Sequence, residues 1–299
     1  MKKRWMALLL ALIVLLGAMG MAEGALTEVE EQQTPVPPAW TPAPEAVSEL
    51  SELPTEAPQA TNETASDLSA EESPQSPYAD MPTVPPLPTQ EPGRLRGVKI
   101  GIDPGHQARA NGDLEAVAPG SSEKKAKVSS GTSGRYSGVA EHVVNLQVSL
   151  QLREALEAEG CEVYMTRESA DVDISNQERA IMMNELGVDL VLRIHCNGST
   201  NSSANGIGLY VRKTGTNAEE CLRAAEALMP AMLEATGARE DGIFRRDTYT
   251  GLNWSEVPSI LVEMGFMTNR EEDLKLNDPE YQEKLVQGMV EGICAYMGR

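Results

Sequence analysis

Residues 98–106 read VKIGIDPGH, and this stretch sets the expectation for the fold. Its first six residues are mostly apolar and rich in β-branched side chains, which predicts a buried strand, and the Pro-Gly pair that follows ends that strand. Two later stretches repeat the pattern, DLVLRIH at residues 189–195 and SILVE at residues 259–263. Strands with such continuous apolar runs are typical of a parallel sheet that is covered on both faces.

Stretches with helical periodicity separate these strands. In one of them, apolar residues recur at helical spacing from residue 141 until Gly160, and in another Ser175 provides an N-cap and Gly187 the end. The expected strands are residues 98–103, 161–166, 189–195, 206–212 and 259–263, and the expected helices are residues 141–159, 175–186, 218–236 and 279–297. Alternating strands and helices predict an α/β fold, with a mostly parallel sheet and helices on both faces. Residues 107–139 are expected to form a long loop.

The N-terminal third differs from the rest in composition. Residues 1–22 have a basic start, an apolar run and a small-residue end, which predicts a signal peptide cleaved after Ala22; an uncleaved membrane anchor is the alternative. Residues 23–96 are expected to be a disordered Pro/Glu/Thr-rich linker, because residues 23–93 hold 14 acidic residues, no basic residue and 14 of the 19 prolines. Residues 97–299 remain as one domain, which is expected to be exported and either secreted or associated with the cell envelope.

Composition excludes some classes of partner. The 299 residues include 45 Asp and Glu against 25 Lys and Arg, a formal net charge of −20, so a nucleic acid bound by a generally basic surface is not expected. Aromatic residues make up only 4%, which argues against a base-stacking surface. The four cysteines, each in an apolar pattern, are expected to be buried free thiols: Cys161, Cys196, Cys221 and Cys294.

Histidines and glutamates mark the ends of the predicted elements. Of three histidines in the chain, His106 and His195 stand just after or at the end of a strand, Glu263 ends another strand, and Glu141 opens the long helix. Because the carboxyl ends of parallel strands meet at one edge of a sheet, we expect these four side chains to lie together. Two imidazoles and one carboxylate, with a fourth position for water, suit catalytic zinc, and a second carboxylate can transfer protons. Spacing alone does not show which of the two glutamates binds the metal and which transfers protons.

Four motifs stand in a fixed order along residues 97–299: DPGH at 103–106, Glu141 followed by Asn145-Leu146, RIHCN at 193–197, and LVEMGFMTN at 261–269. Two shorter motifs lie between them, TR at 166–167 and ERA at 178–180. This order resembles the zinc-dependent N-acetylmuramoyl-L-alanine amidases of the amidase type 3 group. The resemblance implies that His106, Glu141 and His195 bind one zinc ion. It implies that Glu263 is the general base. The reaction it implies is hydrolysis of the amide between the lactyl group of N-acetylmuramic acid and L-alanine in peptidoglycan.

Two other functions fit the same residues. A peptidoglycan-binding module could retain the fold without catalysis, and a zinc peptidase could cut within the stem peptide by the same metal chemistry. In each case peptidoglycan is the expected partner. The N-terminus would associate with the membrane if its apolar run stays uncleaved. The sequence makes no prediction of oligomeric state.

Several neighbouring positions leave alternatives open. His142 adjoins Glu141 and is a zinc donor by type, but neighbours on a helix point about 100° apart, so only one of the two can face the metal. Arg167 and Arg179 are expected either to form ion pairs between a strand end and the next helix or to bind carboxylates of the stem peptide. Residues 247–254 are expected either to line the cleft or to pack as a loop.

The chain departs from the family pattern on either side of the second histidine. Arg193 and Cys196 stand where the family more often has serine and alanine. These positions flank His195 without binding the metal, so the departure concerns fine specificity more than the reaction. Strand alternation points Cys196 to the face opposite His195, and no catalytic role is expected for its thiol.

Overall fold

The computed structural model describes residues 93–299, so the expected signal peptide and nearly all of the expected linker lie outside the described residues. Within them, one sheet of six strands forms the centre of the fold. Its strands, in spatial order, are β4 (Glu162–Met165), β1 (Lys99–Pro104), β5 (Leu190–Asn197), β8 (Ser259–Phe266), β6 (Ile207–Val211) and β7 (Glu240–Arg245). The first four run parallel, β6 is antiparallel to β8, and β7 is parallel to β6. The predicted α/β fold with a mostly parallel sheet is confirmed.

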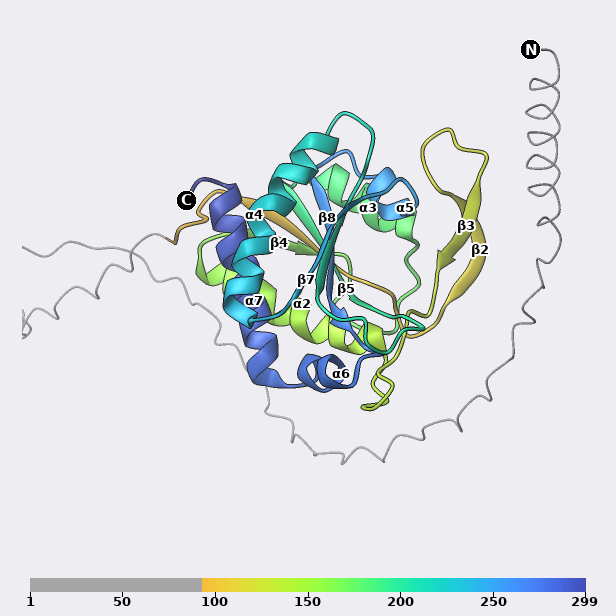
Figure 1. Ribbon diagram of the computed structural model, residues 1–299. Helices are drawn as coiled ribbons and strands as arrows, with labels where there is room; N and C mark the ends of the chain where they lie inside the picture. The colour runs from red at the N-terminus through yellow and green to blue at the C-terminus, as the bar shows by residue number, and fades with distance from the viewer. Residues whose placement is uncertain (1–92) are drawn as a thin grey trace, which may run out of the picture. The chain divides into compact units, whose positions relative to one another are not determined.

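Helices cover both faces of this sheet (Figure 1). One layer consists of α2 (Glu141–Ala158), α4 (Ala218–Thr236) and α7 (Pro279–Tyr296), and the other of α3 (Asn176–Leu186) and the short α5 (Thr250–Asn253). The remaining helix, α6 (Arg270–Leu276), follows β8 directly. No helix among residues 93–299 is long and apolar enough to cross a bilayer.

The two faces of the sheet contain separate apolar cores because strand side chains alternate. Ile102, Leu192 and Val262 are fully buried in the larger core, which they share with α2, α4 and α7. On the opposite face, Val191 packs against Met183 of α3 in a smaller core. Near the carboxyl ends of β5 and β8, this face carries the polar side chains of Arg193, His195 and Glu263. All four cysteines are buried and free, as predicted.

The expectation of an unstructured loop over residues 107–139 is wrong. This segment contains a two-stranded hairpin of β2 (Asn111–Ala116) and β3 (Lys124–Val128). Most side chains of the hairpin are exposed, so its sequence lacks the alternation of apolar and polar residues that reveals a half-buried strand. It is held by contacts far away in sequence: Trp254 Nε1 donates to the Ala116 carbonyl at 2.8 Å.

Candidate metal centre

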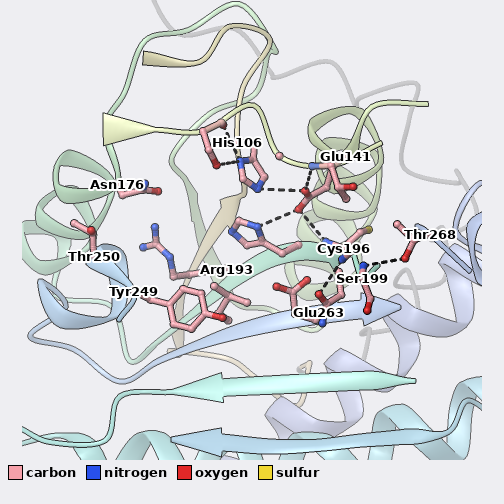
Figure 2. Close-up of a pocket in the computed structure, with 18 of the residues that line it drawn as sticks. His106, Glu141, Asn176, Arg193, Cys196, Ser199, Tyr249, Thr250, Glu263 and Thr268 are labelled. Atoms are coloured by element: carbon pink, nitrogen blue, oxygen red, sulfur yellow. Dashed lines mark hydrogen bonds and ion pairs between the residues drawn. The ribbon is translucent and has the colours of Figure 1, made fainter. Parts of the chain in front are cut away.

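The carboxyl ends of β1, β5 and β8 meet the N-terminus of α2 at one edge of the sheet, and a cleft of about 620 Å³ opens there. Figure 2 shows the side chains that line it. All four residues singled out from the strand and helix ends lie in this cleft: His106, Glu141, His195 and Glu263. The structure therefore brings together the residues that the sequence placed at four separate element boundaries.

Glu141 lies between the two imidazoles. Its Oε2 is 3.3 Å from His106 Nε2, and its Oε1 is 3.2 Å from His195 Nδ1. Backbone N–H groups also donate to this carboxylate, Thr132 to Oε2 at 2.8 Å and Cys196 to Oε1 at 3.0 Å. Burial alone would raise the pKa of Glu141, but the two imidazoles hold it well below its usual range, so the carboxylate is ionised.

The backbone around His106 is shaped for this contact. His106 has a φ of 59°, a left-handed conformation that costs a non-glycine residue energy and that occurs often at functional sites. Its Nδ1 lies 2.9 Å from the Ser129 carbonyl, which leaves Nε2 to face Glu141. A Cβ on Gly105 would lie 2.2 Å from the His195 ring, so only glycine lets the backbone after β1 pass this close to that ring.

The two imidazoles lie edge to face, with ring centroids 4.8 Å apart and planes at 81°. One donor atom from each of His106, Glu141 and His195 falls within 4.8 Å of the others, so this group could hold a metal ion. Burial lowers the pKa of His195, and Glu141 only partly opposes this shift. Burial also acts to lower the pKa of His106, but Glu141 outweighs it and the net shift is upward.

Glu263 stands beside this group without belonging to it. It pairs in register with His195 across β5 and β8, and it lines the same cleft. Its Oε2 is buried and has no hydrogen-bond partner among residues 93–299. Burial raises the pKa of Glu263 well above its usual range, and the charges of Glu141 and Asp241 add to the shift. Such a carboxyl has a buried oxygen without a partner and an environment that favours taking up a proton.

The side chains that neighbour the four site residues lie in different places around the cleft. The Glu141 carboxylate lies between the two imidazoles, whereas His142 lines a separate, smaller cavity. Cys196 belongs to the larger core and also lines the cleft, and its Sγ is 3.5 Å from the Asn145 amide oxygen. Tyr249 and Thr250 of the segment 247–254 do line the cleft.

Arg167 and Arg179 lie beneath the cleft and do not line it. Arg179 forms the expected ion pair, with Nη1 2.8 Å from Asp103 Oδ1. Among residues 93–299 Arg167 makes no ion pair, and it donates to backbone carbonyls instead, including those of Pro104 at 2.9 Å and Gly105 at 3.0 Å. Both guanidinium groups thus brace the backbone that leads into His106.

Two parts of the site were not visible in the sequence. The segment before α2 supplies Ser129 and Thr132 through backbone groups, which carry no side-chain signal. This segment is fixed in turn by Asp273 of α6, whose carboxylate is fully buried and accepts from the backbone N–H of Tyr136 at 2.7 Å and Ser137 at 2.9 Å. The acidic stretch around Asp273 gave no indication of this role, because its partners are 136 and 137 residues away.

Comparison with known proteins gives consistent matches. The sequence model of the family described as N-acetylmuramoyl-L-alanine amidase (Amidase_3) matches residues 100–295. The chain is 30% identical over 216 residues to N-acetylmuramoyl-L-alanine amidase LytC of Bacillus subtilis, covering 71% of this chain but only 39% of LytC. It is 29% identical to N-acetylmuramoyl-L-alanine amidase Rv3717 of Mycobacterium tuberculosis, covering 69% of this chain and 89% of that protein.

A solved structure agrees with these matches. The crystal structure of the apo form of the N-acetylmuramyl-L-alanine amidase Ami1 from Mycobacterium abscessus superposes with a TM-score of 0.62 at 26% identity, covering 68% of this chain and all of that chain. The similarity thus covers two thirds of this chain, close to the extent of its described part.

Proposed function

Because the chain belongs to the N-acetylmuramoyl-L-alanine amidase family, as the order of its motifs indicated, we propose that it hydrolyses the amide between the lactyl group of N-acetylmuramic acid and L-alanine in peptidoglycan. One observation of the structure carries this proposal. A group of two imidazoles and one carboxylate, with donor atoms within 4.8 Å of one another, lies in a cleft together with a buried carboxyl that has an unpartnered oxygen.

The donor set fits a zinc ion held by His106, Glu141 and His195. Two imidazole nitrogens and one carboxylate oxygen are a usual protein ligand set for catalytic zinc, which leaves a fourth position open. The contact from His106 Nδ1 to the Ser129 carbonyl is the kind of support that orients a metal-binding imidazole through its other nitrogen. When bound, zinc supplies Lewis acidity toward a carbonyl oxygen and lowers the pKa of water in its open position to about 7.

Glu263 is the residue that moves the protons. Glu263 lines the cleft and is not part of the three-residue group, and its Oε2 has no partner among residues 93–299, so its carboxyl is available to take a proton from the attacking water. The same carboxyl then gives this proton to the nitrogen of the departing alanine, which must leave as a neutral amine. Burial of Glu263 favours the protonated form that this second step requires.

The site of action follows from the substrate. Peptidoglycan lies outside the cell membrane, so the domain is expected to act extracytoplasmically, either released or held at the envelope. The expected export signal at residues 1–22 agrees with this proposal. Its test is to locate the mature protein in cell fractions and to sequence its N-terminus, which is expected to begin after Ala22 if the signal is cleaved.

Product analysis tests the proposed reaction against both alternatives. Purified protein loaded with zinc is incubated with peptidoglycan, and the new ends are identified by mass spectrometry and amino-terminal labelling. New L-alanine amino termini paired with free lactyl carboxylates are expected. Other amino termini would instead assign a stem-peptide peptidase, and retention on the polymer without new ends would assign a binding module. The Glu263→Gln variant serves as the control for contaminating hydrolases.

A further inference from the structure

Arg193 is a buried charge that faces the cleft. It lies on β5 two residues before His195, so both side chains project from the same face of the sheet. Its side chain is only 4% exposed and lines the cleft, on the side where Thr250 and Asn176 also lie (Figure 2). α5 makes room for it with a glycine: a Cβ on Gly251 would lie 2.1 Å from the Arg193 Cζ.

The donors of Arg193 are largely unused. Among residues 93–299 its single ion-pair contact joins Nη2 to Asp103 Oδ2 at 2.8 Å, and this Oδ2 is not aligned to accept a hydrogen bond. The two other buried arginines of this edge are different. Arg179 donates to Asp103 and Gln107 and to three backbone carbonyls, and Arg167 donates to four carbonyls. Because Arg193 lines the cleft, its donors can be met there by water or by a ligand, and a ligand carboxylate meets them with an opposite charge.

The local charge balance also favours an anion. Arg167, Arg179 and Arg193 are all buried around one carboxylate, that of Asp103, with Glu115 contributing a weaker favourable field at Arg193. Asp103 Oδ1 is already occupied by Thr166 at 2.5 Å and Arg179 at 2.8 Å. Burial lowers the pKa of Arg193, and the charge of Arg179 lowers it further against the opposing effect of Asp103. A carboxylate bound next to Arg193 would supply a second negative charge beside these three arginines.

We infer that Arg193 forms a carboxylate-binding subsite beside the candidate metal centre, which selects stem peptides carrying a free carboxylate close to the cleaved amide. The inference rests on the proposed amidase function and names the part of the substrate that Arg193 recognises. A guanidinium fork matches a carboxylate through two parallel hydrogen bonds. Residues two apart on a strand are separated by about 6.6 Å, roughly the length of two extended peptide residues. The carboxylate therefore belongs to the residue that follows L-alanine.

Two synthetic substrates test this subsite. Both are N-acetylmuramoyl-L-alanyl peptides, and they differ only in a free carboxylate or a carboxamide on the residue after L-alanine. For the wild-type full chain loaded with zinc, kcat/KM is expected to be about tenfold higher for the carboxylate substrate, as suits a charge-assisted bidentate pair. In Arg193→Gln this ratio is expected to fall to about one, and in Arg193→Lys to an intermediate value, because a point charge cannot form the fork.

Controls separate the subsite from folding and from general charge effects. Arg223→Gln removes an exposed arginine of α4, in the helix layer on the other face of the sheet, and is expected to keep the wild-type ratio. Circular dichroism and zinc content verify that each variant is folded and loaded. If Arg193→Gln does not fold, Arg193→Lys retains the charge beside Asp103 and carries the test. Equal ratios in the wild type and in the folded Arg193 variants would overturn the inference.

A binding measurement keeps this test independent of hydrolysis. Calorimetry with the two released stem peptides is expected to show about tenfold tighter binding of the carboxylate form to the wild type and no such difference for Arg193→Gln. Cleavage of both substrates at equal rates would refute the subsite while the amidase proposal stands. Cleavage of neither substrate would refute the amidase proposal, and the binding ratio would still decide on the subsite.

Discussion

Two groups of buried charged side chains lie at the same edge of the sheet, and they differ in whether they line the cleft. In the support group, Asp103 and Thr166 meet Arg179, and the guanidinium groups of Arg167 and Arg179 also donate to backbone carbonyls. These contacts stay within the protein and define the path of the chain into His106. We therefore assign this group a structural role.

The site group lines the cleft instead. His106 and His195 each offer a nitrogen toward the carboxylate of Glu141, and Glu263 keeps a buried oxygen without a partner among residues 93–299. The difference teaches that a place in the cleft, rather than charge or burial, separates functional from structural residues at this edge. Arg193 is buried like the first group and lines the cleft like the second.

The largest expected effect comes from Glu263. We expect Glu263→Gln to lower kcat by about 10²–10⁴-fold, because it removes general acid–base transfer without changing side-chain size. Zinc content and thermal stability should stay near the wild-type values, since no contact that holds the three-residue group involves Glu263. Asp241→Asn, which removes a neighbouring charge, is the matched control. A kcat near the wild-type value in Glu263→Gln would show that the Glu263 carboxyl does not act as the general base.

The support group predicts a loss of stability instead. Asp103→Asn leaves Arg179 and Arg193 buried without their carboxylate, and we expect the free energy of unfolding to fall by about 3–5 kcal/mol. Urea unfolding of the purified protein measures it. The matched control is Asp171→Asn, whose carboxylate pairs with Arg109 at the surface and is expected to matter by less than about 1 kcal/mol. Similar losses in the two variants would contradict the structural role.

Acid should remove the same contribution. Although burial alone would raise the pKa of Asp103, the charges of Arg193 and Arg179 and the hydrogen bond from Thr166 hold it well below 3.8. A carboxyl whose pKa is lower in the folded state stabilises the fold above its unfolded value, and this stabilisation is lost as the pH falls below about 4. The stability difference between the wild type and Asp103→Asn is therefore expected to be largest near neutral pH and to shrink between about pH 4 and pH 2. A difference independent of pH would be inconsistent with an ionised Asp103.

A smaller effect is expected at the segment that precedes α2. Asp273→Asn replaces an acceptor of the Tyr136 and Ser137 hydrogen bonds by an amide that accepts through only one atom, and we expect a loss of about 1–3 kcal/mol in unfolding free energy. Glu271→Gln, which removes an exposed pair with Lys275 on the same helix, is expected to cost under about 0.5 kcal/mol. Equal effects would mean that α6 does not hold this segment.

The strands and helices that carry the site were predictable, and the parts that support it were not. The buried strands of the expected sheet have continuous apolar runs, and the ends of these runs predict that His106, His195 and Glu263 lie at one edge. The β2–β3 hairpin was missed because its exposed strands have no periodic pattern. The contact between Asp273 and the segment before α2 was missed for another reason, since long-range hydrogen bonds to backbone groups have no sequence signature. Arg193 was visible only as a departure from a motif, and its unused donors required the structure.

Metal stoichiometry tests the central claim most directly, namely that the three-residue group of His106, Glu141 and His195 binds zinc. Each purified protein is equilibrated with zinc, freed of excess ion and analysed by mass spectrometry for metal per chain. We expect about one zinc per chain in the wild type and in His142→Ala, and almost none in His106→Ala, Glu141→Ala or His195→Ala. Loss of zinc in His142→Ala alone, or full retention in the other three variants, would contradict the account.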